Sequence, residues 1–266
     1  MSGKRRKKVA APRRSRAARG RDLEIARQIQ TSILPRRVDV EGIEIAAGMV
    51  PADEVGGDYY DVLPVAGGCW IGIGDVAGHG LGAGLIMVMI QSMVMTLVRN
   101  DERARPRDIV CLLNRLLHEN IRSRLNQDDH VTFCLMRYGG DGQVTFAGAH
   151  EEILLWRTAG GCERIATKGT WLGAVRDIDK VTEDQTLQLQ PGDLMILYTD
   201  GLMESRNASG KQFGFERLAA LVEQHRSDSA DVIRKKILAR VKRWTAKQED
   251  DVTVIVIRCQ GVYWSA

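Results

Sequence analysis

Apolar residues recur along this chain with two different spacings, which predict helices and strands. Ile25, Ile29 and Ile33 recur every four residues, which predicts a helix over 22–34 that Pro35 ends. Farther on, short apolar runs between turns rich in Gly, Asp and Pro predict strands. These strands are expected at 42–50, 58–65, 69–76, 130–138, 142–149, 152–158, 162–166, twice within 179–200, and at 250–259. Further helices are predicted at 105–125, 213–225 and 229–244.

The succession of these elements predicts an α+β fold. Strands follow one another in meander-like runs and helices occur in pairs, whereas a doubly wound α/β protein would alternate the two. The sequence has no internal repeat, and no linker interrupts it after residue 21. One main domain is therefore expected.

The segment 80–98 contains no charged residue over 19 positions, which is close to the length that crosses a bilayer. Three glycines at its start and the polar residues Gln91, Ser92 and Thr96 argue against a membrane span. Four methionines suit a helix that is packed on several sides within a folded domain. We therefore predict a buried core helix, with a membrane span as the alternative.

Charge separates the N-terminal tail from the rest of the chain. The formal net charge is +4, but residues 1–21 carry ten Lys and Arg and no acid, which leaves 28 basic and 34 acidic residues for the remainder. The tail lacks the apolar region of a secretory signal, and we expect it to be disordered and able to contact an anionic surface. The five cysteines are widely spaced and form no C-x-x-C pair, so a reducing cytoplasm is the expected location.

The first candidate ligand-binding segment is "CWIGIGDVAGHGLGAGL". A strand pattern changes into a helix pattern there, around Asp75. Gly72, Gly74 and Ala77 spell G-x-G-x-x-A, a dinucleotide-binding signature. That signature requires a second strand after the helix, and the polar loop "RNDERARPRD" stands there instead. A carboxylate inside the phosphate cradle would also repel the ligand. The context therefore favours the other interpretation of Asp75, a metal ligand.

Aspartates at the ends of several predicted strands support a metal site. The set is Asp58, Asp61, Asp75, Asp200, Asp250 and Asp251. Each of them taken alone is explained as well by the capping of a turn. Carboxylates that converge without basic partners repel one another, however, and a divalent cation removes that cost. Oxygen ligands favour Mg²⁺ or Mn²⁺ over zinc.

Five motifs of the chain occur in the order in which one enzyme family has them. They are "IQTSILP", "PADEVGGDYYD", "GDVAGHG", "LYTDGLMESRNASGKQFGFERL" and "DDVTVIVIR", and together they span about residues 22–258. On these motifs the chain resembles the SpoIIE/RsbU branch of the PPM-type, metal-dependent serine/threonine protein phosphatases. The resemblance implies two stacked, mainly antiparallel sheets flanked by helix pairs, and a centre with two or more Mn²⁺ or Mg²⁺ ions. It divides the chain into a disordered tail (1–21), a regulatory or linker helix (22–36) and a phosphatase domain (37–260).

The resemblance also implies roles for single residues. Asp75 matches the aspartate that bridges both metals, and Val76 matches the residue that offers its backbone carbonyl. Asp200 and Asp250 match ligands of one metal, while Asp58 matches an acid that acts on the other metal, directly or through water.

Three further positions carry open alternatives. Asp251 follows a ligand position and is included in the predicted metal set. His79 is either a general acid, which would make the catalytic set Asp58, Asp75 and His79, or a residue that only begins a helix. The chain departs from the family in "FAGAHEEILLW", where His150 is shifted from its usual place and acids stand where prolines are common, so substrate access is expected to differ.

The implied reaction is the hydrolysis of phosphoserine or phosphothreonine on a regulatory protein, which the family suggests is a STAS-type anti-sigma-factor antagonist, by water that two metals activate. The alternative is a non-catalytic module that docks a signalling partner. A nucleic-acid-binding protein is disfavoured because no RRM, KH or helix-turn-helix pattern occurs. Helix 22–34 is marginal by itself in water, so it is expected to pack on the domain or to form a homodimer with the same helix of a second copy. A separate sensor or activator protein is expected to supply its signal.

Overall fold

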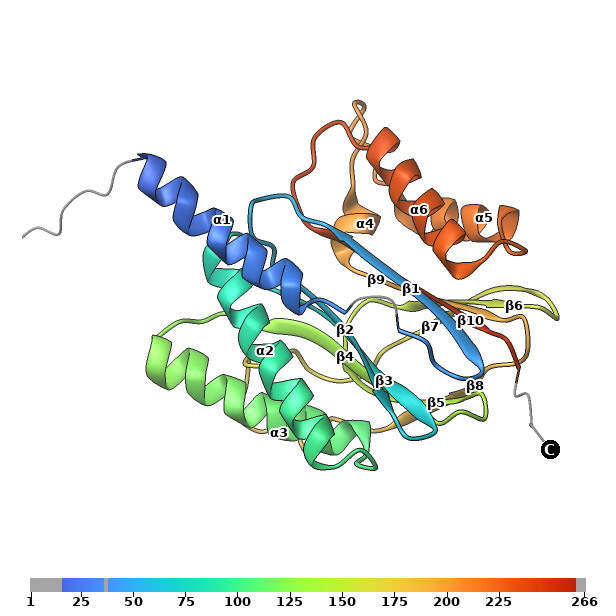
Figure 1. Ribbon diagram of the computed structural model, residues 1–266, viewed down its shortest axis with the longest axis horizontal. Coiled ribbons are helices and arrows are strands. Elements are labelled where there is room, and N and C mark those ends of the chain that lie inside the picture. The colour runs from blue at the N-terminus through green and yellow to red at the C-terminus, as the bar shows by residue number, and fades with distance from the viewer. Residues whose placement is uncertain (1–15, 36–37, 262–266) are drawn as a thin grey trace, which may run out of the picture.

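Strands with apolar side chains on both faces build the centre of the molecule. They form two five-stranded antiparallel sheets that stack on each other, and helices cover both outer faces (Figure 1). This arrangement, seen in a computed structural model that describes residues 16–35 and 38–261, confirms the predicted α+β class with two mainly antiparallel sheets.

The sheets differ in the helices that cover them. The first sheet consists, in spatial order, of β1 (Ile43–Val50), β10 (Val252–Cys259), β9 (Leu194–Tyr198), β6 (Ile153–Arg157) and β7 (Gly161–Ile165). The second consists of β2 (Asp58–Val65), β3 (Gly68–Val76), β4 (Val131–Tyr138), β5 (Gln143–Ala149) and β8 (Gln185–Gln188). The helices are α1 (Arg16–Ile33), α2 (Leu81–Asn100), α3 (Pro106–His118), which a π-helical segment (Glu119–Leu125) prolongs, α4 (Asp200–Glu204), α5 (Gly214–Gln224) and α6 (Ala230–Trp244). Helices α2 and α3 pack on the second sheet, and α5 and α6 pack on the first.

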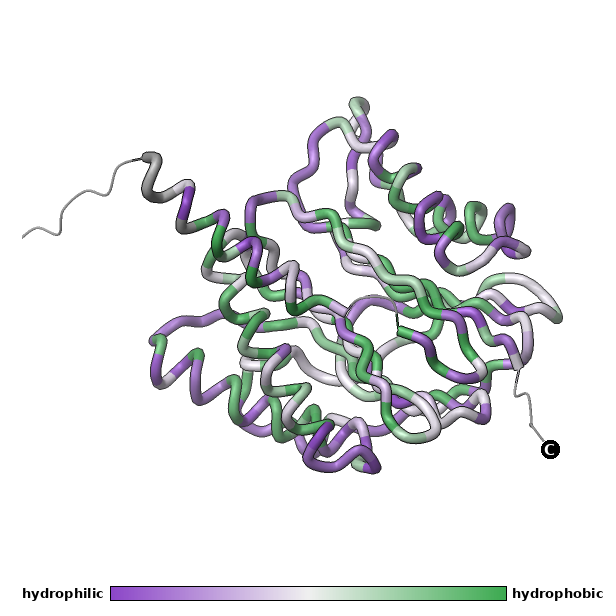
Figure 2. The backbone as a smooth tube through the Cα atoms, viewed as in Figure 1, coloured by the Kyte–Doolittle hydropathy of each residue, from purple (hydrophilic) through white to green (hydrophobic). Residues whose placement is uncertain are grey.

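Period-two alternation decides which side chains fill which layer. Along β3, Ile71 and Ile73 lie between the two sheets, while Trp70 and Val76 face α2 and α3. All four are at most 1% exposed, and full burial of side chains of this size contributes about 1.5–3 kcal/mol each. Figure 2 shows the same division along the chain, with hydrophobic residues following the strands and hydrophilic residues following the outer sides of the helices. Asp75 continues the series 71, 73, 75 and therefore sits at the end of the inter-sheet core.

Helix α2 contains the apolar stretch that is long enough to cross a membrane by length and composition. In the structure Met87, Ile90 and Val94 are 0% exposed and belong to the core under the second sheet. The helix packs on β2, β3 and α3. The described fold therefore agrees with the prediction of a buried core helix.

Helix α1 begins at Arg16, six residues ahead of its predicted start. Residues 16–21, which the sequence assigned to a disordered tail, are therefore helical, and the alanines in "RAARGR" favour that state. Residues 1–15, the rest of the predicted tail, lie outside the described part of the chain. In Figure 1, α1 lies beside α2 and projects away from the sheets at its N-terminal end.

Candidate metal centre

The predicted metal residues gather at one end of the space between the sheets. Asp58, the first residue of β2, stands directly opposite Asp75 in the β2–β3 register. Asp200 follows β9 as the first residue of α4, and Asp250 precedes β10. The two sheets thus bring to one place four acids that are far apart in the sequence.

Asp58 is held by hydroxyl groups of the opposite sheet. Its Oδ2 accepts hydrogen bonds from Thr199 Oγ1 at 2.9 Å and from Thr253 Oγ1 at 2.5 Å. The side chain is 1% exposed, and burial, followed by the charge of Asp75, raises its pKa well above the ordinary value. Asp58 is therefore a fixed carboxylate whose second oxygen has no hydrogen-bond donor among the described contacts.

Asp200 and Asp250 approach each other because a glycine stands between their backbones. A Cβ at Gly201 would overlap the carbonyl oxygen of Asp251 and lie 3.2 Å from the Cβ of Asp250. Burial raises the pKa of both acids, and the charge of Asp200 raises the pKa of Asp250 further.

Asp75 lies at the centre of this negative charge. Burial raises its pKa to about 8, and the charges of Asp200, Asp250, Asp251 and Glu151 add to that effect. Carboxylates rather than cations surround it, and oxygen donors with uncompensated negative charge are the ligands that Mg²⁺ and Mn²⁺ prefer. The donor set therefore fits a hard divalent cation.

The acids do not close into a compact shell by themselves. Within residues 16–35 and 38–261, no three His, Cys, Asp or Glu side chains converge as closely as a metal site requires. Repulsion between like charges opposes such an approach. The carbonyl oxygen of Val76, the predicted backbone ligand, faces Gly57, where a Cβ would stand 3.1 Å from it.

Both oxygens of Asp251 already accept hydrogen bonds from backbone amides. Oδ1 accepts from the backbone N–H of Ala52 at 2.7 Å, and Oδ2 accepts from that of Gly57 at 2.6 Å. The side chain is 5% exposed. This geometry favours a role in holding the loop before β2 over the predicted metal ligation, which stays a prediction for Asp250.

His79 lies at the surface rather than among the acids. Its side chain is 77% exposed, and Nδ1 stands 2.9 Å from Asp53 Oδ2. It lies close enough to Asp250 to lower the pKa of that acid slightly. Its action as a general acid remains a prediction.

His150, which the sequence marked only as a departure from the family, joins the two sheets beside the site. Its Nε2 donates to the carbonyl oxygen of Tyr198 at 3.0 Å, so the neutral ring accepts at Nδ1 from the hydroxyl of Thr132 at 2.9 Å. Burial lowers the pKa of His150 to about 4, which keeps the ring neutral. Thr132 stands opposite Asp75, and Tyr198 precedes Asp200 by two residues.

Glu151 is a further acid that sequence reasoning did not count in the metal set. Burial raises its pKa, and the charge of Asp200 adds to that effect. It is also among the charges that raise the pKa of Asp75. Its position directly after His150 at the end of β5 was the available signal, because β5 ends beside the strand that faces Asp75.

Helix α1 reaches the site through one buried amide. Gln30 is 2% exposed; its Nε2 donates to the carbonyl oxygen of Gly56 at 2.6 Å, and its Oε1 accepts from the N–H of Gly56 at 3.0 Å. Gly56 belongs to the same loop that Asp251 holds, one residue before Gly57. Helix α1 is therefore directly bonded to the loop before β2.

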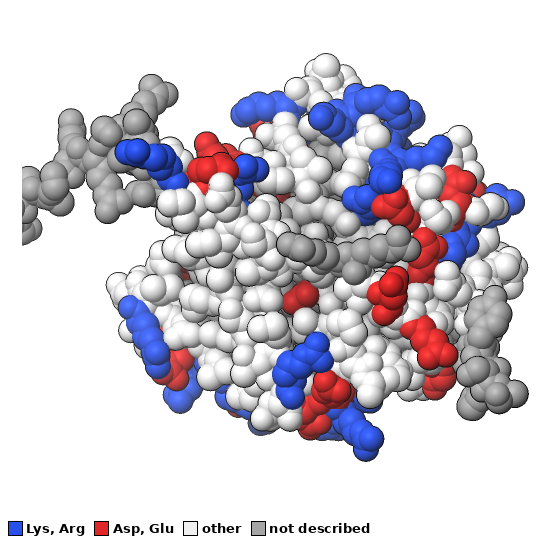
Figure 3. All heavy atoms as spheres, viewed as in Figure 1, with Lys and Arg blue, Asp and Glu red and all other residues white. Residues whose placement is uncertain are grey.

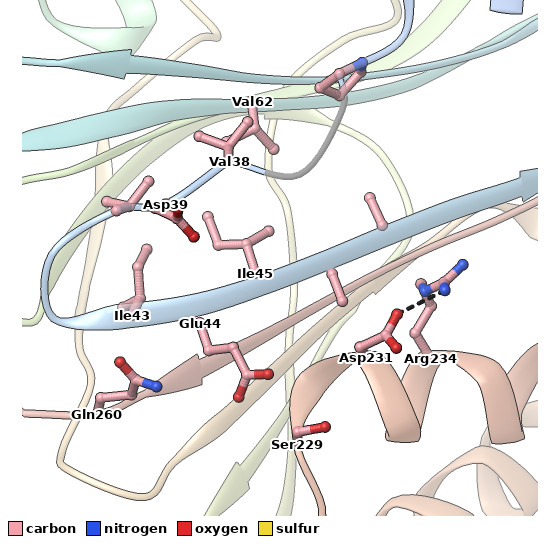
Figure 4. Close-up of a pocket in the computed structure, with 14 residues that line it drawn as sticks. Val38, Asp39, Ile43, Glu44, Ile45, Val62, Ser229, Asp231, Arg234 and Gln260 are labelled. Carbon is pink, nitrogen blue, oxygen red and sulfur yellow. Dashed lines mark hydrogen bonds and ion pairs between the residues drawn. The ribbon is translucent and has the colours of Figure 1, made fainter.

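The structure also has a groove whose lining residues differ from those of the acid cluster (Figure 4). The segment that follows α1, strand β1 and the start of α6 enclose it, with Val38, Ile43 and Ile45 on its apolar side and the ion pair Asp231–Arg234, at 2.7 Å, on its polar side. None of the predicted metal residues lines it. The groove is therefore separate from the cluster of predicted metal residues.

Comparison with known proteins identifies relatives over most of the chain. The family model of stage II sporulation protein E (SpoIIE) matches residues 66–260. Phosphoserine phosphatase RsbU of Bacillus subtilis (strain 168) is 31% identical over 244 residues, which cover 89% of this chain and 70% of that protein. The chain spans 41% and 57% of two more distant relatives.

Solved structures resemble the fold at lower sequence identity. The SiaA-PP2C domain of Pseudomonas aeruginosa matches with a TM-score of 0.77 and 24% identity over 91% of this chain and 97% of that one. The catalytic domain of the serine/threonine phosphatase PstP, solved in complex with two manganese ions, matches with a TM-score of 0.58 and 13% identity over 81% of this chain and 97% of that one. The two stacked sheets are therefore the PP2C-type fold.

Proposed function

The chain belongs to the SpoIIE family and is a PP2C-type phosphatase, and we propose that it removes phosphate from serine or threonine of a regulatory protein with the help of two Mn²⁺ or Mg²⁺ ions. A STAS-type anti-sigma-factor antagonist is the proposed substrate class. The observation that carries the proposal is the convergence of acids from separate segments at the end of the inter-sheet core, with a pKa of about 8 at Asp75.

The chain's own residues have distinct tasks in this proposal. Asp75, Asp200, Asp250 and the Val76 carbonyl would hold the cations, with Asp58 on the side of β2. When bound, the ions supply an acidified water and positive charge near the phosphoryl oxygens. The hydroxyls that bond Asp58 keep its carboxylate aimed, and Asp251 fixes the loop beside it. His79, exposed at the rim, is the proposed donor of a proton to the leaving serine oxygen.

Hydrolysis of p-nitrophenyl phosphate with and without Mn²⁺ tests the proposal. We expect activity that a chelator abolishes, and a loss of several orders of magnitude in Asp75→Asn, because that change would remove a carboxylate proposed to hold the cations. A matched control is Asp61→Asn, which changes a buried acid that bonds Gln91 on the helix side of β2. Full turnover in excess chelator would contradict the metal mechanism, and a folded protein without turnover at any metal concentration would favour the alternative of a docking module.

We also propose that α1 contacts a second copy of the chain. Ile25 and Ile29 are 55% and 52% exposed, whereas Ile33 packs against the core. The apolar stripe therefore divides into a buried end and an uncovered part, which suits a short helix–helix seam. Light scattering of Ile29→Asp should show a lower mass than the wild type, with Gln28→Asp on the polar face as the control. If both variants keep the wild-type mass, the exposed part of the stripe does not form a homodimer. It then binds a separate activator protein or has no partner.

A cytoplasmic location is part of the same proposal. The cysteines are all free thiols, and Cys162 is the exposed one. A reducing compartment preserves this state. Fractionation of cells that produce the tagged protein would check it.

A further inference from the structure

An exposed tryptophan, Trp171, stacks on the half-buried His130 close to the acid cluster. Trp171 is 51% exposed, although it is one of the largest side chains of the protein. Its ring lies on the imidazole of His130, with centroids 4.8 Å apart and planes 14° apart. An exposed tryptophan is a frequent anchor in protein recognition.

The strand register places this pair on the face that carries the acids. Thr132 is opposite Asp75, and Val131 forms a bridge with Leu172. Since side chains alternate along a strand, and Val131 and Leu172 both point into the core under the helices, His130 and Trp171 point to the same side as Thr132 and Asp75. Two strand spacings separate Trp171 from Asp75, which amounts to about 10 Å.

The segment that carries Trp171 is held firmly. Leu172 and Val131 exchange two backbone hydrogen bonds of 2.9 Å. Asn114, which is 0% exposed, accepts from the N–H of Gly173 at 2.9 Å and donates to the carbonyl oxygens of Val175 and Arg176 at 3.0 and 3.1 Å. The side chain of Asn114 is thus bonded entirely to this segment. A surface mounted in this way needs little ordering when a partner binds.

We propose that His130 and Trp171 form a docking platform for the polypeptide of the phosphorylated substrate, against which an apolar side chain close to the phosphoserine packs. This inference rests on the proposed function, because the platform matters only if a phosphoserine reaches the acids. The occupant follows from position: a chain whose phosphate lies at Asp75 passes within about 10 Å of the pair. An extended peptide advances about 3.3 Å per residue, so the contact falls roughly three residues from the phosphoserine.

The experiment compares two substrates on the same variants. The probes are p-nitrophenyl phosphate, which is too small to span both places, and a STAS-domain protein phosphorylated on serine. For Trp171→Ala we expect kcat/KM on the phosphoprotein to fall about tenfold, mainly through KM, while turnover of p-nitrophenyl phosphate stays unchanged. Trp171→Phe should restore most of the loss. Val181→Ala, which alters a residue 56% exposed on the same connection between β7 and β8, should have no effect.

The outcomes separate this inference from the proposed function. If the wild type hydrolyses both probes and Trp171→Ala has the wild-type kcat/KM on each, the docking role of Trp171 is refuted. The phosphatase activity is then still supported. An equal loss on both probes means that Trp171 supports the site structurally, which also overturns docking. If the wild type hydrolyses neither probe with Mn²⁺, the proposed function itself fails. His130→Ala provides a second variant, and a selective loss on the phosphoprotein in that variant supports the platform.

Discussion

At the scale of single residues, burial and the neighbouring acids make it costly for Asp75 to lose its proton when no cation is bound. The pKa of Asp75 is about 8 in the fold and 3.8 in an unfolded chain. Between these values the unfolded chain has lost the proton and the folded chain keeps it. Unfolding then releases a proton, so the free energy of unfolding falls as the pH rises from 3.8 toward 8.

This sign predicts that Asp75→Asn stabilises the metal-free protein. The neutral amide removes the repulsion, and the gain is on the order of a few kcal/mol at pH 8 and much smaller at pH 4. We expect Tm in chelator at pH 8 to rise by roughly 4 °C or more. Mn²⁺ should raise Tm of the wild type and leave the variant nearly unchanged. A variant that is less stable than the wild type in chelator at pH 8 would contradict the repulsion argument.

His150 shows the opposite dependence on pH. Its pKa is about 4 in the fold and 6.5 when unfolded, so unfolding takes up a proton between these values. The stability that the neutral ring supplies is complete above pH 6.5 and is lost as the pH falls toward 4. His150→Gln should flatten the dependence in this window, which unfolding in urea at a series of pH values would measure.

The same residue should position the metal ligands. His150→Ala removes the tie between Thr132 and Tyr198, and we expect the Mn²⁺ concentration for half-maximal activity to rise about tenfold. His150→Gln, whose amide can donate to Tyr198 and accept from Thr132, should recover part of this loss. Equal Mn²⁺ requirements in the wild type and the Ala variant would refute the positioning role.

Residue-scale prediction from sequence succeeded where the chemistry is local. Asp75 and Asp200 stand out because an acid at the end of an apolar strand is costly to bury. The hydroxyls that bond Asp58 did not stand out, since Thr199 and Thr253 are more than 140 positions away from it. Only the packing of one sheet on the other brings them together. The string "DD" likewise does not show that Asp251 accepts hydrogen bonds from the distant residues Ala52 and Gly57, whereas Asp250 accepts one from its neighbour Asp251.

At the scale of elements, α1 is bonded to the loop that leads into Asp58 at the start of β2. Removal of the Gln30 amide leaves the N–H and C=O of Gly56 without partners in a buried place, at a cost of about 1–3 kcal/mol for each group. We expect Gln30→Ala to weaken the apparent affinity for Mn²⁺ about tenfold and to speed hydrogen exchange at Gly56 and Gly57. Gln28→Ala is the matched control, because among the described residues that exposed amide bonds Glu24 within its own helix.

Two outcomes would contradict this coupling of α1 to the loop before β2 through Gln30. Unchanged exchange at Gly56 in Gln30→Ala would mean that the loop is held by Asp251 alone. A change of similar size in Gln28→Ala would point to a general loosening of α1 rather than to the amide.

Element-scale prediction depended on the strength of the periodic signal. The strand β10 and the helices α5 and α6 lie where their patterns placed them. The start of α1 was missed because basic residues without an apolar stripe give no periodicity, although alanines favour a helix. Helix α4 was missed because five residues are too few to show a period.

At the scale of the whole molecule, the order of strands and paired helices was sufficient to predict the two-sheet class. The order of strands within each sheet was not predictable from local pattern. Strand β8 joins the second sheet although β7 and β9 belong to the first. Such crossovers depend on packing of distant segments, which one sequence does not display.

Charge at this scale is divided between the tail and the folded body. Residues 1–15 contain seven Lys and Arg and no acid. The body also has a basic region, which Figure 3 shows as Lys and Arg gathered near α6. A groove between α5 and α6 is lined by five of them, namely Arg217, Lys235, Lys236, Arg240 and Arg243. A salt-sensitive affinity for anionic surfaces therefore has two sources that deletion can separate.

We predict that deletion of residues 1–15 leaves hydrolysis of p-nitrophenyl phosphate and Tm unchanged, because the acids, the core and α1 all lie outside this segment. Binding to vesicles with anionic lipid at 50 mM salt should fall at least tenfold, since charge attraction to such a surface amounts to about 1 kcal/mol for each Lys or Arg near it. The double variant Lys236→Ala/Arg240→Ala, which keeps the tail, is the control for the basic groove. If that variant loses the binding and the deletion does not, the body rather than the tail meets the anionic surface. A large fall in turnover after the deletion would show instead that the tail acts on the catalytic centre, which no described contact suggests.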